Sequence, residues 1–316
     1  MAGKFESDDI PRGRLLIHPE RLYGLGESTS AILDQFRKIM PIASLPTGVE
    51  LYYETHGAGE ALLLFPSTAF SGEVWKPYQV PALAPAMQLI LHDPRGCPRT
   101  KTNQRVYTIE QMANDALAML DHLKISKAHL LGHSMGGRVA LTLALNFPGR
   151  VKSLVMAASG SGLVTRPGLD CIPGLPHWLV FGLVEKGFEK FLRHEYCESE
   201  IFFTQEFRAA HPERIEEFYK LARATHADLS EYIHLSIARH NWEATHRLGD
   251  VRVPTLVLIG TNDKARSNHL LQAEALKSRI PGAELKVLEN QSHGFFWQAP
   301  EETNAVILDW VSRHAS

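Results

Sequence analysis

The chain has 316 residues, 44% of them hydrophobic, so it can bury one large α/β core with an accessory region and need not divide into separate globular domains. Its formal net charge of -2 and the lack of any run of basic residues argue against nucleic acid as a partner. Its three cysteines, Cys97, Cys171 and Cys197, lack Cys-x-x-Cys spacing, which argues against a disulfide framework and a structural zinc site.

The first 40 residues are expected to form an N-terminal extension. Residues 1–9 are polar and charged, without the apolar segment of a secretion signal, and no stretch reaches the roughly 18 apolar residues that span a membrane. We therefore expect a cytoplasmic protein without a membrane partner. Residues 31–40 have apolar residues at helical spacing, which predicts a short amphipathic helix that packs on the outside of the core. A dimer contact or an active-site flap is the alternative, and the sequence does not indicate an oligomeric state.

After residue 40, strand-like and helix-like segments alternate along the chain. Residues 42–45 and 49–53 flank Pro46-Thr47-Gly48, which predicts a hairpin where the sheet begins. Buried strands are predicted at 61–65, 127–131, 151–157, 254–260 and 283–288, and helices at 109–123 and 138–146. This alternation predicts an α/β fold with a mostly parallel, twisted sheet and helices on both faces.

The segment Gly132-His133-Ser134-Met135-Gly136 lies where a predicted strand meets a predicted helix. A sharp turn there holds the central serine near strained dihedral angles, so the residues two positions away must be small. The turn exposes the serine hydroxyl and points the helix N-terminus at it, where backbone N–H groups can stabilise an oxyanion. The pattern predicts Ser134 as a nucleophile and the N–H of Met135 as one oxyanion donor.

A serine nucleophile needs a base to take its proton and an acid to orient that base. Asp263 follows the predicted strand 254–260 and is the candidate acid. A turn residue that bonds its own backbone is the alternative role for Asp263. Asp250 and Glu289 are the other candidate acids, but Asp250 precedes the strand and lies at the wrong end.

His293 is the candidate base, because it lies in a polar turn after the predicted strand 283–288. The chain has 16 histidines, so most of them must have other roles. His133 is the main rival, but neighbouring residues on such a turn point away from each other. We therefore expect His133 to line the substrate pocket.

From about residue 159 to residue 246 no buried strand is predicted, and helices are expected at 175–184, 188–194, 206–222 and 229–240. This segment is predicted to be a helical cap inserted into a core made of residues 41–158 and 247–316. An insertion that leaves the sheet at the carboxyl ends of its strands should cover the nucleophile. We expect the cap to set substrate selectivity while supplying none of the three catalytic residues.

Aromatic residues of the cap could line an apolar pocket, and Trp178 is the one assigned to substrate binding. The others are Phe181, Phe188, Phe191 and Tyr196. For each of them, packing of the cap onto the core is the alternative role. Arg193, His194 and Arg239 could meet a substrate carboxylate or be solvated charges, and none is assigned a role.

Three motifs and their order along the chain resemble those of the α/β-hydrolase superfamily, from about residue 51 to the C-terminus apart from the insertion. They are Asp93-Pro94-Arg95-Gly96, the Ser134 turn, and Ser292-His293-Gly294 followed by three aromatic residues. The resemblance is to a capped serine hydrolase of esterase or lactonase type. It implies a second oxyanion donor after residues 61–65, where counting back from Glu73-Val74-Trp75 selects the N–H of Thr68. Proline at position 98 departs from the family's usual Gly-x-Gly-x-Ser turn.

The expected activity is hydrolysis of a carboxylic ester or lactone of a small, largely apolar substrate through an acyl-enzyme. This mechanism needs no metal and no organic cofactor. Within enzymes, similar capped members imply hydrolysis of a carbon–carbon bond in a ring-cleavage product as the alternative. A ligand-binding receptor on the same fold is the alternative outside enzymes.

Overall fold

The structure is a computed structural model that describes residues 41–104, 106–162, 177–265 and 269–315, without the side chains of His177 and Trp178. The helix predicted at residues 31–40 lies outside this range. Within it, no helix is both long enough and apolar enough to cross a bilayer.

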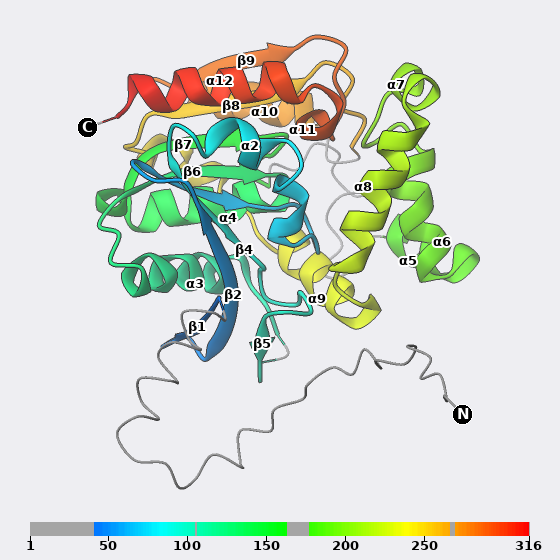
Figure 1. The fold of residues 1–316 in the computed structure, drawn as a ribbon, viewed down its shortest axis with the longest axis horizontal. Coiled ribbons are helices and arrows are strands. Elements are labelled where there is room, and N and C mark those ends of the chain that lie inside the picture. The colour runs from blue at the N-terminus through cyan, green and yellow to red at the C-terminus, as the bar shows by residue number, and fades with distance from the viewer. Residues whose placement is uncertain (1–40, 105, 163–176, 266–268, 316) are drawn as a thin grey trace, which may run out of the picture. The chain divides into compact units, whose positions relative to one another are not determined.

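In the described part of the chain, nine strands form one sheet in the order β1-β2-β4-β3-β6-β7-β8-β9, with β5 beside β2 (Figure 1). The partners of β2 run antiparallel to it, and every pair from β4 to β9 is parallel. The strands are Ile42–Leu45 (β1), Val49–His56 (β2), Ala61–Phe65 (β3), Gln88–His92 (β4), Lys101–Thr102 (β5), Ala128–His133 (β6), Val151–Ala157 (β7), Thr255–Gly260 (β8) and Glu284–Leu288 (β9). The predicted mostly parallel α/β sheet is confirmed.

Helices flank this sheet, and α3 packs on α4 while α2 packs on α12. The α-helices are Gln79–Leu83 (α2), Ile109–His122 (α3), Met135–Asn146 (α4), His177–Lys186 (α5), Phe188–Arg193 (α6), Gln205–Ala210 (α7), Pro212–Ala224 (α8), Leu229–His240 (α9), His269–Arg279 (α10), Phe295–Gln298 (α11) and Pro300–Arg313 (α12). Short 3₁₀ turns cover Gly72–Trp75, Pro148–Arg150 and Thr245–Asp250, and a π turn covers His194–Glu198.

The hairpin at the start of the sheet forms as predicted. Ala43 pairs with Leu51 in the antiparallel register of β1 and β2. The turn closes through the Gly48 N–H, which donates to the Leu45 carbonyl oxygen at 3.0 Å, and Gly48 has a φ of +79°. Glycine adopts that left-handed conformation without strain, which explains its place in the turn.

The centre of the sheet is fully buried. Every residue of β3, β6 and β8 is buried, which is typical of parallel strands covered by helices on both faces. Because β6 lies between β3 and β7, the turn that follows β6 lies at the middle of the sheet's carboxyl edge.

Helices α5 to α9 follow one another between β7 and β8, and Figure 1 shows them grouped at one side of the sheet. The Ala227 N–H, between α8 and α9, donates to the carbonyl oxygen of Ala69 in the loop after β3, at 3.1 Å. These helices therefore contact the loops around the carboxyl ends of the strands. The division of the chain into core, cap and extension stays a prediction.

The single helix predicted at residues 206–222 is wrong, because two helices occupy this stretch. Helix α7 ends at Ala210, and α8 begins at Pro212. Proline has no N–H to continue a helix, and it disfavours helical angles in the preceding residue, here His211. Pro212 instead takes the first position of α8, where the missing N–H costs nothing.

Candidate active site

Ser134 sits in a tight turn between β6 and α4. Its φ of 55° and ψ of -116° lie in a region that residues with a side chain rarely adopt. A β-carbon at Gly132 would collide with the backbone of Gly136, and one at Gly136 would collide with the carbonyl oxygen of Phe65. The two flanking glycines therefore allow the strained turn that presents Ser134 at the N-terminus of α4.

Asp263 and His293 come together after β8 and β9. The His293 Nδ1–H donates to Asp263 Oδ2 at 2.9 Å, and the side chain of Asp263 is fully buried. Burial alone would raise the pKa of Asp263, but the nearby His293 and His269 outweigh this effect and hold it well below its usual range. Asp263 is thus a carboxylate that fixes the orientation and tautomer of His293.

A second histidine, His269, shares this carboxylate and was not predicted from the sequence. Its Nδ1–H donates to the same oxygen, Asp263 Oδ2, at 3.1 Å. Its ring is stacked on that of His293, with the centroids 4.9 Å apart and the planes at 19°. The signal in the sequence is a histidine six residues after the candidate acid.

His133 connects the Ser134 turn with the loop that carries His293. Its Nε2–H donates to the His293 carbonyl oxygen at 2.9 Å, and the two ring centroids are 4.8 Å apart. Burial, and secondarily the proximity of His293, lower the pKa of His133 well below its usual value. Neutral His133 is therefore a structural neighbour of His293 rather than a competing base.

The hydroxyl of Ser134 makes no hydrogen bond to any residue that the structure describes. In enzymes without bound substrate, the bond from nucleophile to base is commonly long and tightens only when the substrate is held. The arrangement therefore brings Ser134, His293 and Asp263 to one edge of the sheet.

The N–H of Met135 is at the first position of α4 and, among the described residues, has no hydrogen-bond acceptor. The same holds for the N–H groups of Ser67, Thr68 and Ala69 in the buried loop after β3. Gly136 lies against the end of β3, so this loop begins beside the turn of Ser134. Thr68 is thus one of three consecutive N–H groups that can face an oxyanion together with Met135.

Two arginines lie near this loop. Arg239 Nη1 donates to Thr68 Oγ1 at 3.3 Å, and Arg138 Nη1 donates to the Arg239 carbonyl oxygen at 2.6 Å. Burial, together with the charge of Arg239, lowers the pKa of Arg138 to about 9. Of the other cationic candidates, Arg193 pairs with Glu216, and His194 lies at 3.5 Å from Glu198.

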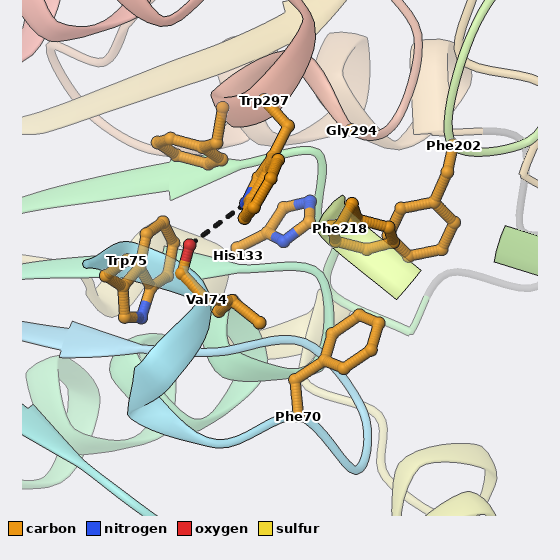
Figure 2. Close-up of a pocket in the computed structure, with 9 residues that line it drawn as sticks. Phe70, Val74, Trp75, His133, Phe202, Phe218, Gly294 and Trp297 are labelled. Atoms are coloured by element: carbon orange, nitrogen blue, oxygen red, sulfur yellow. Dashed lines mark hydrogen bonds between the residues drawn. The ribbon is translucent and has the colours of Figure 1, made fainter. Parts of the chain in front are cut away.

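A small apolar pocket lies beside His133 and Gly294. Figure 2 shows His133 within it, with Phe202 and Phe218 of the inserted segment on one side and Val74 and Trp75 on the other. The remaining lining residues are Phe70, Phe296 and Trp297. The pocket is thus lined by residues of both the predicted core and the predicted cap, and it lies next to the residues adjoining Ser134 and His293.

The structure places two of the aromatic residues that were candidates for lining the pocket. Phe181 is 65% exposed and is not among the pocket residues. Tyr196 is buried but packs behind the pocket on Phe70 and Phe202, with centroids 4.9 and 5.1 Å apart. The side chain of Trp178 lies outside the described residues, so its assignment stays a prediction.

Asp263, His269 and His293 are the one group within the described ranges with metal-ligand atoms close together, within 4.8 Å. Both Nδ1 atoms carry protons that they donate to Asp263, and a metal ion would have to replace these protons. The group is therefore organised as a hydrogen-bonded network. The expected lack of a metal and a cofactor stays a prediction.

Comparisons with known proteins agree with this architecture. Residues 56–300 match the model of a family described as alpha/beta hydrolase fold. A putative carbamate hydrolase RutD from Azorhizobium caulinodans is 28% identical over 262 residues, which cover 82% of this chain and 94% of that protein. A 2-hydroxy-6-oxononadienedioate/2-hydroxy-6-oxononatrienedioate hydrolase from Paraburkholderia phymatum is 28% identical over 283 residues, which cover 84% and 92%. The enol-lactonase from Burkholderia xenovorans LB400 has the same fold, with a TM-score of 0.73 at 24% identity over 86% of this chain and 100% of its own.

Proposed function

We propose that this chain, which belongs to the α/β-hydrolase fold family, is a serine hydrolase that cleaves a carboxylic ester or lactone through an acyl-enzyme. That it is a hydrolase follows from relatives that are themselves named hydrolases. The bond cleaved and the covalent intermediate are our proposal. The observation that carries it is the strained turn of Ser134, joined through His133 to a histidine that donates to a buried carboxylate.

In the proposed reaction, Ser134 Oγ attacks the substrate carbonyl carbon while its proton passes to His293 Nε2. The N–H of Met135 and one N–H of the loop around Thr68 hold the oxyanion. His293 then gives the proton to the leaving alkoxide oxygen, and the acyl-enzyme forms. His293 then takes a proton from a water molecule, and the resulting hydroxide attacks the acyl carbon. As the bond from that carbon to Ser134 Oγ breaks and the acid leaves, His293 returns the proton to Ser134 Oγ. Asp263 stays ionised throughout, in agreement with its lowered pKa.

The apolar pocket supports a small, largely apolar substrate. Its lining consists mostly of aromatic side chains and includes His133, which we propose contacts the substrate. An acyl group of modest size would be desolvated there, which favours binding by about 0.8 kcal/mol for each buried CH₂. Trp178 remains a proposed additional contact.

Hydrolysis of a carbon–carbon bond is the second candidate, and the relative from Paraburkholderia phymatum, 28% identical over 84% of this chain, favours it. A ligand-binding receptor is a third possibility, in which the same pocket holds a molecule without turning it over. From the sequence we propose that the partner is a small molecule, that neither nucleic acid nor a membrane is a partner, and that the protein is cytoplasmic.

Labelling with a fluorophosphonate, followed by a substrate panel, tests the proposal. The panel contains p-nitrophenyl esters of increasing acyl length, several lactones, a carbamate and a vinylogous 1,5-diketone for carbon–carbon cleavage. We expect labelling and ester or lactone turnover, and Ser134→Ala should lower turnover by about 10⁴-fold without unfolding the protein. Ligand binding without turnover would favour the receptor, and near-native activity of Ser134→Ala would refute the serine mechanism.

A further inference from the structure

Among the described residues, three N–H groups donate hydrogen bonds to the carboxylate of Asp263. His293 Nδ1 and His269 Nδ1 both donate to Oδ2, at 2.9 and 3.1 Å, and the Ala265 backbone N–H donates to Oδ1 at 2.9 Å. The mechanism proposed above uses only the first of these bonds. The bond from His269 therefore needs an explanation of its own.

His269 is held firmly in this position. It is the first residue of α10, it is buried, and its ring is stacked on that of His293. The charged and titratable groups that act on it are Asp263, His293 and Arg138. Burial lowers the pKa of His269, so the ring is neutral at pH 7 and keeps a single proton, which the bond to Asp263 places on Nδ1.

We propose that His269 is a positioning residue of the site: it fixes the Asp263 carboxylate, shares its negative charge, and supports one ring face of His293. This proposal rests on the proposed serine mechanism, because it concerns how His293 serves as the base for Ser134.

The expected effect follows from charge sharing. A carboxylate that accepts hydrogen bonds from two imidazoles stabilises the imidazolium of His293 less than a carboxylate with one partner does. Removal of the His269 N–H should therefore strengthen the interaction between Asp263 and the imidazolium of His293. His133 is the other imidazole that contacts His293, but it is neutral and donates to the backbone carbonyl oxygen of His293. His133 therefore does not share the charge of Asp263 as His269 does.

Two variants separate the hydrogen bond from the stacked ring. His269→Phe keeps a flat ring against His293 but removes the N–H donor, whereas His269→Asn keeps an N–H donor but removes the ring. We expect His269→Phe to lower kcat by roughly 10-fold with little change in KM, since Asp263 becomes less well oriented. The acidic limb of its kcat/KM profile should move to higher pH by about 0.5 to 1 unit. His269→Asn should stay within about threefold of the parent and keep the parent's acidic limb.

Nitrogen-15 NMR of histidine-labelled protein gives a readout that does not depend on turnover. The parent should show two imidazoles with the proton on Nδ1 and bonded to a carboxylate, and His269→Phe should show one. Ser134→Ala should keep both signals. Melting temperatures establish that each variant is folded, and if His269→Phe fails to fold, the parent spectrum still decides the proton position.

The proposal is overturned if the parent shows only one such imidazole, or if folded His269→Phe has the parent's kcat and pH profile. It is also overturned if both His269 variants lose activity equally with an unmoved acidic limb, because that result indicates a merely structural role. Failure of the serine mechanism looks different, since Ser134→Ala would then retain turnover whatever the His269 variants do.

Discussion

The backbone N–H of His293 donates to the carbonyl oxygen of Ile201, 3.1 Å away, so the inserted segment holds the candidate catalytic base. The next residue repeats the contact, since the Gly294 N–H donates to the Phe202 carbonyl oxygen at 2.8 Å. The Ser292 hydroxyl donates to the same oxygen at 2.5 Å. Ile201 and Phe202 therefore contribute to the position of His293, a role that the sequence analysis did not predict for the cap.

Gly294→Ala tests this contact. A β-carbon at Gly294 would lie 2.5 Å from the Phe202 carbonyl oxygen, so the histidine loop and the insertion must move apart. A displacement of about 1 Å at a catalytic group can cost roughly 100-fold in rate. We expect kcat and the rate of fluorophosphonate labelling to fall together by about 10- to 100-fold.

Gly249→Ala is the matched control, because a β-carbon at Gly249 meets nothing within 4 Å. Both variants should be compared at a temperature where circular dichroism shows them folded. Equal activities of the two variants would mean that the Ile201–Phe202 contact does not position His293.

The loop after β3 gives a second prediction. Thr68→Pro removes a backbone N–H and should lower kcat by about 100-fold if that N–H holds the oxyanion. Thr68→Ala keeps the N–H and loses only the hydroxyl that accepts from Arg239, so its effect should be mild. The melting temperature of Thr68→Pro must be measured first, because the adjoining Ala69 has a φ of 64° and the loop is tightly constrained. A folded Thr68→Pro with full activity would transfer the role to Ser67 or Ala69, whose N–H groups are equally free of acceptors in the described structure.

The contact between Asp263 and His293 could be predicted because it depends on topology. The carboxyl ends of parallel neighbours β8 and β9 meet at one edge of the sheet, so residues that follow them come close. The contact of His269 with Asp263 could not be predicted in this way, because His269 is the first residue of α10 and does not follow a strand. Hydrophobic periodicity does not say which side chain the first residue of a helix will meet.

The sequence also predicted that the inserted segment is helical, but it did not predict how its helices are oriented. Apolar residues at helical spacing predict a helix and leave open which neighbour each side chain meets. Phe181 was one candidate for the pocket lining and is exposed, whereas Phe218 of α8 lines the pocket. The difference arises from the packing of α8 against the core, where the Phe218 ring meets that of Trp297 with centroids 5.1 Å apart.

Phe218→Leu tests the pocket as the acyl-binding site. The smaller side chain should favour longer acyl groups, shifting the ratio of kcat/KM between long and short p-nitrophenyl esters by about 1 kcal/mol, or roughly fivefold. Phe181→Leu is the control, because that ring is largely exposed and the ratio should not change. An unchanged ratio in folded Phe218→Leu would show that the acyl group binds elsewhere.

The Asp-x-Arg-Gly turn gives a prediction about stability. Arg95 Nε and Nη2 donate to Asp115 at 2.5 and 2.9 Å, and both side chains are almost fully buried. Arg95→Met leaves Asp115 unpaired in the core and should cost about 3–5 kcal/mol, measured by urea unfolding. Arg313→Met breaks the ion pair of Arg313 with Glu284. These side chains are 43% and 51% exposed, so the loss of stability should be much smaller than that of Arg95→Met. Adding Asp115→Leu to Arg95→Met should recover much of the lost stability. If Arg95→Met and Arg313→Met were equally destabilising, the buried pair of Arg95 with Asp115 would not have the stabilising role expected here.

Buried histidines predict how stability depends on pH. Burial lowers the pKa of His92, His129 and His226 to about 4, and burial with the nearby charge of Arg239 lowers that of His240 to about 3. In the unfolded chain these groups titrate near pH 6.5. Between about pH 6.5 and pH 4 the unfolded state therefore binds protons that the folded state does not, so stability is full above this range and decreases as the pH falls through it.

Urea-unfolding midpoints at pH 7 and pH 5 measure this effect, and we expect a clearly lower midpoint at pH 5. Each histidine contributes up to about 1.4 kcal/mol per pH unit in this range. His240→Gln removes one of these groups while retaining a polar side chain, so the difference between the two midpoints should become smaller. His246→Gln is the control, because the His246 side chain is 71% exposed and its replacement should leave the difference unchanged. A midpoint that stays constant or rises from pH 7 to pH 5 would mean that these histidines take up protons in the folded protein, which their burial opposes.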